Sequence, residues 1–169
     1  MADGKFSITI QTEEKPTNQG MDSVEFLISA NKGQPQQAIN KVASGGELSR
    51  ISLAIQVACA EVTSLPTLIF DEVDVGIGGS IAEVVGQKMQ QLGKHCQVLS
   101  ITHLGQVAAY GNQQLNISKS STENTTTTQV IELNNAQRTE EIARMVGGMI
   151  ITEQTRKHAQ EFLQNALGK

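Results

Sequence analysis

Two adjacent carboxylates, Asp71 and Glu72, follow a short apolar run at residues 67–70. Acids directly after a buried strand lie where open α/β sheets bind their ligands. An acid in that place can hold a hydrated magnesium ion, and a second can accept a proton from an attacking water. Because neighbouring side chains of an extended segment point to opposite sides, we expect Asp71 to face the metal and Glu72 the water. A solvated turn after the strand is the alternative interpretation.

A glycine-rich segment, Ser44-Gly45-Gly46-Glu47, leads into an apolar stretch. Glycines at the positive end of a helix dipole leave backbone N–H groups open, and such a helix start can bind phosphate. The same segment fits a capping box, in which Ser44 and Glu47 satisfy the first N–H groups of the helix without any ligand. From the residues alone, both interpretations stay open.

A histidine, His103, follows a second apolar segment at residues 97–102. An imidazole there could hydrogen-bond a terminal phosphate and respond to its loss, although a histidine after a strand more often has a structural role. Cys59 and Cys96 form no CxxC pattern and have no metal-ligand histidine spacing beside them. We therefore interpret both cysteines as reduced, structural thiols.

The first half of the chain should position the glycine-rich segment. Apolar and polar residues alternate at 6–10, and this pattern with the apolar run at 24–29 predicts an antiparallel hairpin. Residues 31–40 show no hydrophobic periodicity, which predicts a loop. Apolar residues on most sides of 47–62 predict a helix that is largely buried.

The middle of the chain predicts a parallel strand pair. Residues 67–70 form a buried strand, residues 81–92 have apolar positions at helical spacing, and residues 97–102 form the next strand. Strand, helix and strand in this order favour a right-handed crossover.

The last third of the chain predicts a second hairpin and two helices. The strands are 114–119 and 128–133, with a mobile tip at 120–127. A short helix at 140–146 should stop at the glycine pair that follows it, and Thr152 should cap a last helix to about residue 167. The overall fold class is α/β.

Composition limits the function. The 169 residues carry 17 acidic and 13 basic side chains, for a net charge of −4, and aromatic residues make up 3%. These values argue against a sequence-independent nucleic-acid clamp and against base-stacking platforms. The chain has neither an apolar run of membrane-spanning length nor a signal-peptide pattern, so we expect a cytosolic protein with no membrane partner.

The order of these features resembles the ABC-type ATPase superfamily. A glycine-rich helix start, a strand ending in Asp71-Glu72, a crossover helix and a strand ending in His103 are similar to its signature motif, Walker B motif and switch histidine. The resemblance implies the carboxy-terminal lobe of an ATPase head, with parallel strands flanked by helices plus antiparallel hairpins. It also implies ATP and Mg²⁺ as cofactors.

The resemblance implies a role for each motif. Asp71 would orient magnesium through water, Glu72 would activate the hydrolytic water, and His103 would contact the terminal phosphate. The signature motif would bind the ATP held by an opposing head, through Ser44, Gly45, Gly46 and Glu47. Arg50 would support the signature loop or lie on a solvated helix face.

Details of the motifs narrow the branch. Asp71-Glu72-Val73-Asp74 and the acidic Glu47 are similar to the SMC-like branch for chromosome maintenance and DNA repair, whereas transporter subunits usually read Asp-Glu-Pro and end the signature in Gln. Longer runs resemble the carboxy-terminal part of the head in a bacterial family of double-strand-break repair proteins. These runs are residues 41–62, 71–79, 102–108 and 141–148.

This resemblance implies an ATPase acting in DNA double-strand-break repair and recombination. ATP binding between two heads and its hydrolysis would drive head closure and opening on DNA, in the cytoplasm at the nucleoid. The nucleotide-binding lobe of an ABC transporter motor and a non-enzymatic interaction module of the same fold are the alternatives.

A Walker A loop is not found. It needs Gly-Lys followed by Ser or Thr, and none of the three Gly-Lys pairs of the chain is followed by either residue. By resemblance, residues 1–169 are a single partial domain, with a hairpin and loop at 1–40 and the three motifs at 41–169. Its partners would be an amino-terminal lobe that carries Walker A, a second head in a homodimer, and DNA through the full-length assembly. The piece alone would be inactive.

Two residues depart from the pattern. Gly78 stands where other branches carry the aspartate of the D-loop, which puts signalling between subunits through that acid in doubt. Gly105 stands where the family commonly has proline, so we expect a looser turn after His103 that leaves the imidazole in place.

Overall fold

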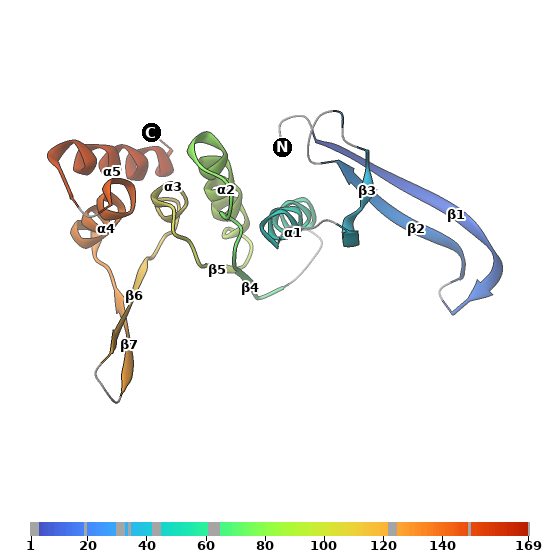
Figure 1. Cartoon of the computed structure of the whole chain (residues 1–169), viewed down its shortest axis with the longest axis horizontal. Helices are drawn as coiled ribbons and strands as arrows, with labels where there is room; N and C mark the ends of the chain where they lie inside the picture. The colour runs from blue at the N-terminus through green and yellow to red at the C-terminus, as the bar shows by residue number, and fades with distance from the viewer. Residues whose placement is uncertain are drawn as a thin grey trace. The chain divides into compact units, whose positions relative to one another are not determined.

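The computed structural model describes residues 4–18, 20–29, 33, 35–41, 45–60, 65–121, 125–148 and 150–168. The chain divides into two compact units, Met1–Leu48 and Ser49–Lys169, and helix α1 (Gly45–Cys59) runs from one into the other. Parallel strands with helices and separate antiparallel hairpins make up the chain, which confirms the α/β class (Figure 1).

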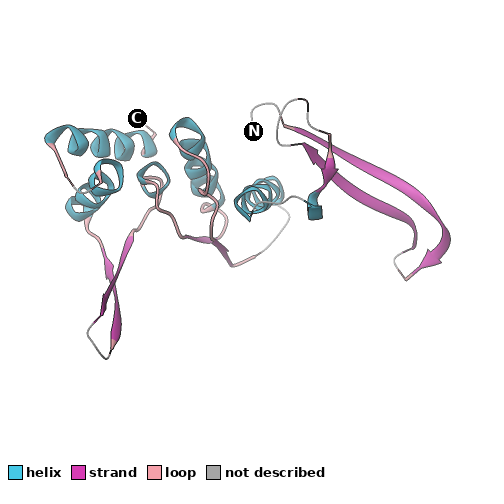
Figure 2. Ribbon diagram, viewed as in Figure 1, coloured by secondary structure: helices cyan, strands magenta, loops and turns pink. Residues whose placement is uncertain are grey.

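The first unit is a three-stranded antiparallel sheet. The long hairpin β1 (Lys5–Thr17) and β2 (Gly20–Ser29) is drawn in magenta in Figure 2. The predicted hairpin is confirmed, and its strands extend further into the turn than expected. The loop prediction for residues 31–40 is wrong at β3 (Gln37–Ala38), which pairs with β2 and leads into a short 3₁₀ helix, Ile39–Lys41. A two-residue strand is too short to show a period in the sequence.

One face of the β1–β2 hairpin is apolar and exposed. The register places Ile8 opposite Phe26 and Phe6 opposite Ile28. The rings of Phe6 and Phe26 stack with centroids 6.0 Å apart, yet Phe6 remains 58% exposed and Ile10 67%. Apolar side chains that the unit itself does not cover mark a contact surface.

The second unit contains the predicted parallel pair. Strands β4 (Thr67–Phe70) and β5 (Gln97–Ser100) pair in parallel, and α2 (Gly79–Leu92) connects them. A core forms among α1, α2, these strands and the loops after them. Its buried residues are Leu53, Phe70, Val73, Ala82, Val85, Met89, Leu92 and Val107.

The prediction that α1 is largely buried and that β4 is buried is wrong. Leu53 of α1 is 3% exposed, but Ile55 on the same helix is 49% exposed. In β4, Phe70 is buried whereas Ile69 is 69% exposed. The sheet has only two strands, and the described residues cover one side of it and one side of α1, so the apolar side chains on the other side meet solvent.

Helices α3 (Gly105–Ala108), α4 (Asn135–Gly147) and α5 (Glu153–Ala166) share a second core. Helix α4 begins five residues before the prediction, because Asn134 and Gln137 form a capping box. It ends at the glycine pair and Thr152 caps α5 as expected. Helix α3 was not predicted, since four residues are too few to show helical periodicity.

The second hairpin is confirmed as well. Strands β6 (Leu115–Ser121) and β7 (Thr126–Glu132) pair antiparallel over seven residues. The strands therefore include part of the predicted tip, and residues 122–124 lie outside the described part of the chain.

Both cysteines are free thiols. Among the described helices, none has the length and apolar character needed to cross a membrane.

Candidate functional site

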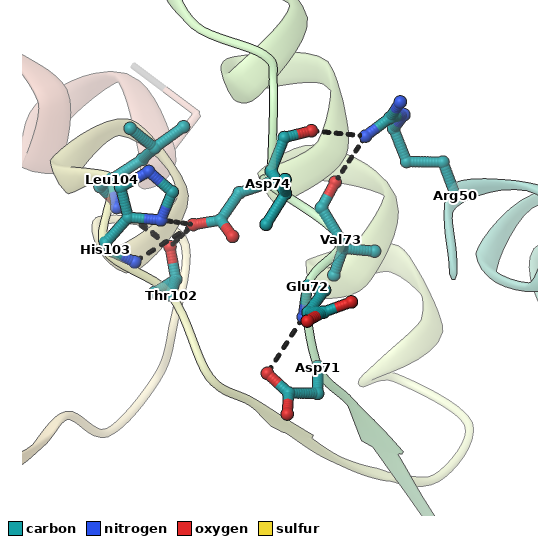
Figure 3. Close-up of polar contacts among 9 residues, drawn as sticks. Arg50, Asp71, Glu72, Val73, Asp74, Thr102, His103 and Leu104 are labelled. Carbon is teal, nitrogen blue, oxygen red and sulfur yellow. Dashed lines mark hydrogen bonds and ion pairs between the residues drawn. The ribbon is translucent and has the colours of Figure 1, made fainter. Parts of the chain in front are cut away.

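The acidic pair lies in a tight turn after β4. Glu72 has a φ of 60°, in the left-handed region, and its backbone N–H donates to Oδ1 of Asp71 at 2.9 Å (Figure 3). The expectation of an extended segment is therefore wrong, because the chain turns at Glu72 itself. Both carboxylates are exposed, so both remain accessible to a ligand.

The conformation of Glu72 is strained. Among the described residues it is the one non-glycine residue with a positive φ, and the left-handed region costs an L-residue about 1–2 kcal/mol. Strain of this kind clusters at functional sites, where the surrounding structure maintains it. The sequence carries no signal of it, since glutamate is not typical of that conformation.

A third acid, Asp74, was missed as a site residue in the sequence. It is 2% exposed, and its Oδ2 accepts hydrogen bonds from the Thr102 hydroxyl and, at 3.0 Å, from the backbone N–H of His103. The Nδ1 atom of His103 lies 3.2 Å from the same oxygen. Buried carboxylates need such partners. The position of Asp74 in the acidic run was the available signal, but its burial depends on tertiary structure.

The switch-histidine candidate is thereby joined to the turn after β4. The side chain of His103 is 66% exposed, whereas that of its partner Asp74 is 3% exposed. The turn after the histidine is held by a hydrogen bond from the N–H of Leu104 to the Thr102 hydroxyl.

Gly105 is buried, and a Cβ there would lie 3.1 Å from the Val146 side chain. Close packing on α4 therefore favours glycine at this position.

Arg50 supports the turn after β4. Its Nη1 donates to the carbonyl oxygens of Val73 at 3.2 Å and Val75 at 2.9 Å (Figure 3). The solvated alternative for Arg50 is wrong, because the side chain is committed to these two carbonyls. The loop it holds here is the one that carries the acids.

The signature segment is only partly described. Helix α1 begins at Gly45, with Gly46 and Glu47 in its first turn. Ser44 lies outside the described residues, and both the phosphate seat and the capping box at Ser44 stay predictions. Gly45, Gly46 and Glu47 belong to the first compact unit, and Asp71, Glu72 and His103 to the second.

The donor set fits a water-rich magnesium site. Within the described ranges, no group of three or more His, Cys, Asp or Glu side chains could enclose a metal ion. Magnesium usually keeps several waters and binds through one or two carboxylates plus substrate phosphates. The exposed carboxylate of Asp71 can serve as such a partial ligand.

Comparison with known proteins shows which proteins the chain is similar to. The chain is 50% identical over 164 residues to the DNA repair protein RecN of Vibrio cholerae and 48% identical to that of Haemophilus influenzae, matching 96% of this chain in each case. The chain is a homologue of one segment of RecN. It spans only 30% and 29% of the length of these two RecN proteins. No protein-family model matches.

Solved structures of similar fold support the architecture of the chain. An Smc head domain from Pyrococcus yayanosii matches 82% of this chain and 25% of its own, at 19% identity and a TM-score of 0.60. An Smc head from Pyrococcus furiosus matches 83% of this chain and 34% of its own, at 20% identity and a TM-score of 0.56. These neighbours confirm the predicted fold, which is that of part of an Smc head domain.

Proposed function

We propose that this chain is the part of an SMC-like ATPase head that carries the signature, Walker B and switch-histidine motifs, in a longer protein that acts in DNA double-strand-break repair and recombination. The observation that carries the proposal is the strained turn at Glu72, which Asp74 joins to His103. Similarity to RecN points to the same process. ATP binding between two heads would close them, and hydrolysis would open them, on DNA.

Three residues of the second unit, Asp71, Glu72 and His103, would each have a distinct part in hydrolysis. The exposed carboxylate of Asp71 would hold water molecules of a magnesium ion, which when bound would neutralise phosphate charge. Glu72 would accept the proton of the water that attacks the terminal phosphorus as ADP leaves. His103 would contact the terminal phosphate from the loop after β5. The Glu72 side chain is exposed, so a water can reach its carboxylate.

The signature motif would act between heads. Gly45, Gly46 and Glu47 lie at the start of α1, where N–H groups without intrahelical partners favour an anion. The motif would bind the terminal phosphate of ATP on a second copy, in a homodimer of heads, through Ser44, Gly45, Gly46 and Glu47.

An amino-terminal lobe with the Walker A loop would complete each head. Two apolar surfaces support this: the exposed face of the β1–β2 hairpin, and the outer side of the parallel pair, where Ile69 is 69% and Leu99 46% exposed. The chain alone should therefore bind magnesium-ATP weakly or not at all. Calorimetry tests this, because a micromolar dissociation constant, about −8 kcal/mol, would locate the nucleotide site within these 169 residues.

The deciding experiment is Glu72→Gln in the longer protein. ATP binding should persist while hydrolysis slows by about a hundredfold or more, the scale for loss of a general base, and the closed dimer should accumulate. Glu132→Gln, on the exposed strand β7, controls for the lost charge. If Glu72→Gln hydrolyses ATP at the parental rate, Glu72 is not the base. If the unsubstituted protein does not hydrolyse ATP, an interaction module replaces the proposal.

A further inference from the structure

We propose that Asp74 is a positioning residue that holds the imidazole of His103 in one orientation and one tautomer. The Nδ1 atom faces the carboxylate, and Nε2 is left for a ligand. The identity of this ligand rests on the proposed function, in which the ligand is the terminal phosphate of ATP or the water beside it. The orientation itself rests on the contacts around Asp74.

Three contacts converge on one oxygen of Asp74. Its Oδ2 receives the Thr102 hydroxyl, the backbone N–H of His103 at 3.0 Å and the Nδ1 atom of His103 at 3.2 Å. The backbone hydrogen bond fixes the position of the His103 main chain relative to Asp74, and the contact of Nδ1 fixes the rotation of the imidazole ring. A carboxylate only accepts hydrogen bonds, so a hydrogen bond between the ring and Asp74 needs the imidazole proton on Nδ1. Figure 3 shows the imidazole turned toward Asp74.

Stability alone does not explain the ring contact. The hydroxyl of Thr102 and the backbone N–H already give the buried carboxylate two partners. The His103 side chain is 66% exposed, and exposed ion pairs contribute little to folding. Fixing an exposed imidazole matters when its other nitrogen has a task, as it does for histidines oriented by a carboxylate in metal and catalytic sites.

The carboxylate is itself held in place from both sides. Arg50 binds the carbonyl oxygens of Val73 and Val75, the residues before and after Asp74. The turn therefore cannot rotate freely about Asp74. An orienting group must be more rigid than the group it orients, and the two carbonyl contacts provide this rigidity.

Nitrogen NMR of ¹⁵N-histidine-labelled chain tests the inference without any ATPase measurement. The chain has three histidines, and His103→Gln assigns the signal of interest. Above the pH where imidazoles titrate, His103 should be protonated on Nδ1 and bare on Nε2. The opposite tautomer in the unsubstituted chain would overturn the inference, whether or not any variant folds.

Two variants separate the ring contact from general damage. Asp74→Ala should abolish the preference for the Nδ1–H tautomer, and an unchanged preference in a folded variant overturns the inference. Thr102→Val removes a different hydrogen bond to the same oxygen. The preference should survive in Thr102→Val, and its loss to the same extent as in Asp74→Ala would show that any damage to the turn has this effect.

A double-mutant cycle in the longer protein tests the consequence. Asp74→Ala should lower kcat about 10- to 100-fold, the scale for groups that orient a functional histidine. Because Asp74 acts through His103, the double variant with His103→Gln should be no slower than His103→Gln alone. If the double variant instead lowers kcat by the product of the two single effects, the positioning role is contradicted. If NMR shows the Nδ1–H tautomer but the longer protein lacks ATPase activity, the proposed function fails and the positioning stands.

Discussion

The guanidinium of Arg50 donates to the carbonyl oxygen of Val75, with Nη1 and the oxygen 2.9 Å apart and the two residues 25 positions apart in the chain. The same nitrogen reaches the carbonyl of Val73 at 3.2 Å. Helix α1 and the turn after β4 are thereby joined by a side chain from the helix that begins with the signature glycines. A substitution that moves helix α1 should therefore also move the turn after β4.

Arg50→Gln should lower the free energy of unfolding by about 1.5–3 kcal/mol, the range for hydrogen bonds to a charged group, because the shorter side chain loses its hydrogen bonds to the two carbonyls. Urea unfolding measures the change. Lys94→Gln removes a positive charge from an exposed loop and should change stability by less than about 0.5 kcal/mol. Equal losses in the two variants would mean that the contacts of Arg50 contribute nothing.

Glu72→Gly should stabilise the chain while Glu72→Gln should not. Glycine relieves about 1–2 kcal/mol of left-handed strain but costs about 0.5–1 kcal/mol in backbone entropy, so we expect a net gain of up to about 1.5 kcal/mol. Glutamine keeps the strain, and both variants should slow hydrolysis in the longer protein by about a hundredfold or more. A glycine variant less stable than the glutamine variant would contradict the strained conformation.

Gly86→Ala should destabilise the chain, although alanine usually favours a helix. A Cβ at position 86 would lie 2.5 Å from Cδ2 of Tyr110. The Tyr110 ring is buried, and its hydroxyl accepts a hydrogen bond from Gln87, so it cannot move freely. Overpacking of this kind costs about 1–3 kcal/mol. Thermal unfolding should show the loss, and Gly93→Ala, where the nearest atoms are 3.4 Å away, should be nearly neutral.

Acid should weaken α4 through Glu141. A bidentate hydrogen bond from Arg144, at 2.7 and 2.9 Å, holds the pKa of Glu141 below its ordinary value. A lowered folded-state pKa contributes stability that is present above the unfolded pKa, near 4.3, and is lost as the pH falls through the folded value. Glu141→Gln should therefore cost about 0.5 kcal/mol at pH 7, the scale of a helix ion pair, and progressively less below pH 4. A difference that stays constant with pH would contradict this assignment.

Ser44→Arg separates a helix cap from a contact between heads. Loss of a cap alone should cost about 1 kcal/mol of stability and leave head dimerisation intact. If Ser44 faces the nucleotide of the other head, ATP-dependent dimerisation and hydrolysis should disappear while each head still binds ATP, and this is the result we expect. Mixing with a Walker A variant should then restore part of the hydrolysis, and no recovery with both partners folded would count against the trans contact.

The parallel pair and the placement of Asp71 and His103 after its strands could be predicted, because apolar runs and helical spacing are local properties of the sequence. The burial of β4 could not, since Ile69 is as apolar as any core residue and only tertiary structure decides whether something covers it. Asp74 was missed for the same reason. The left-handed turn at Glu72 depends on the acids, Val73 and Arg50 together, and no single residue type signals it.

The β1–β2 hairpin bears on how the longer protein reaches its native state during translation. All of its strand pairs lie within residues 5–29, and hairpins close in about 1–10 μs, far faster than ribosomes add residues. Its apolar side of Phe6, Ile8, Ile10 and Phe26 would therefore be formed as soon as these strands leave the ribosome. The amino-terminal lobe proposed to cover that side would by then already have been synthesised, so the hairpin could dock on it during translation.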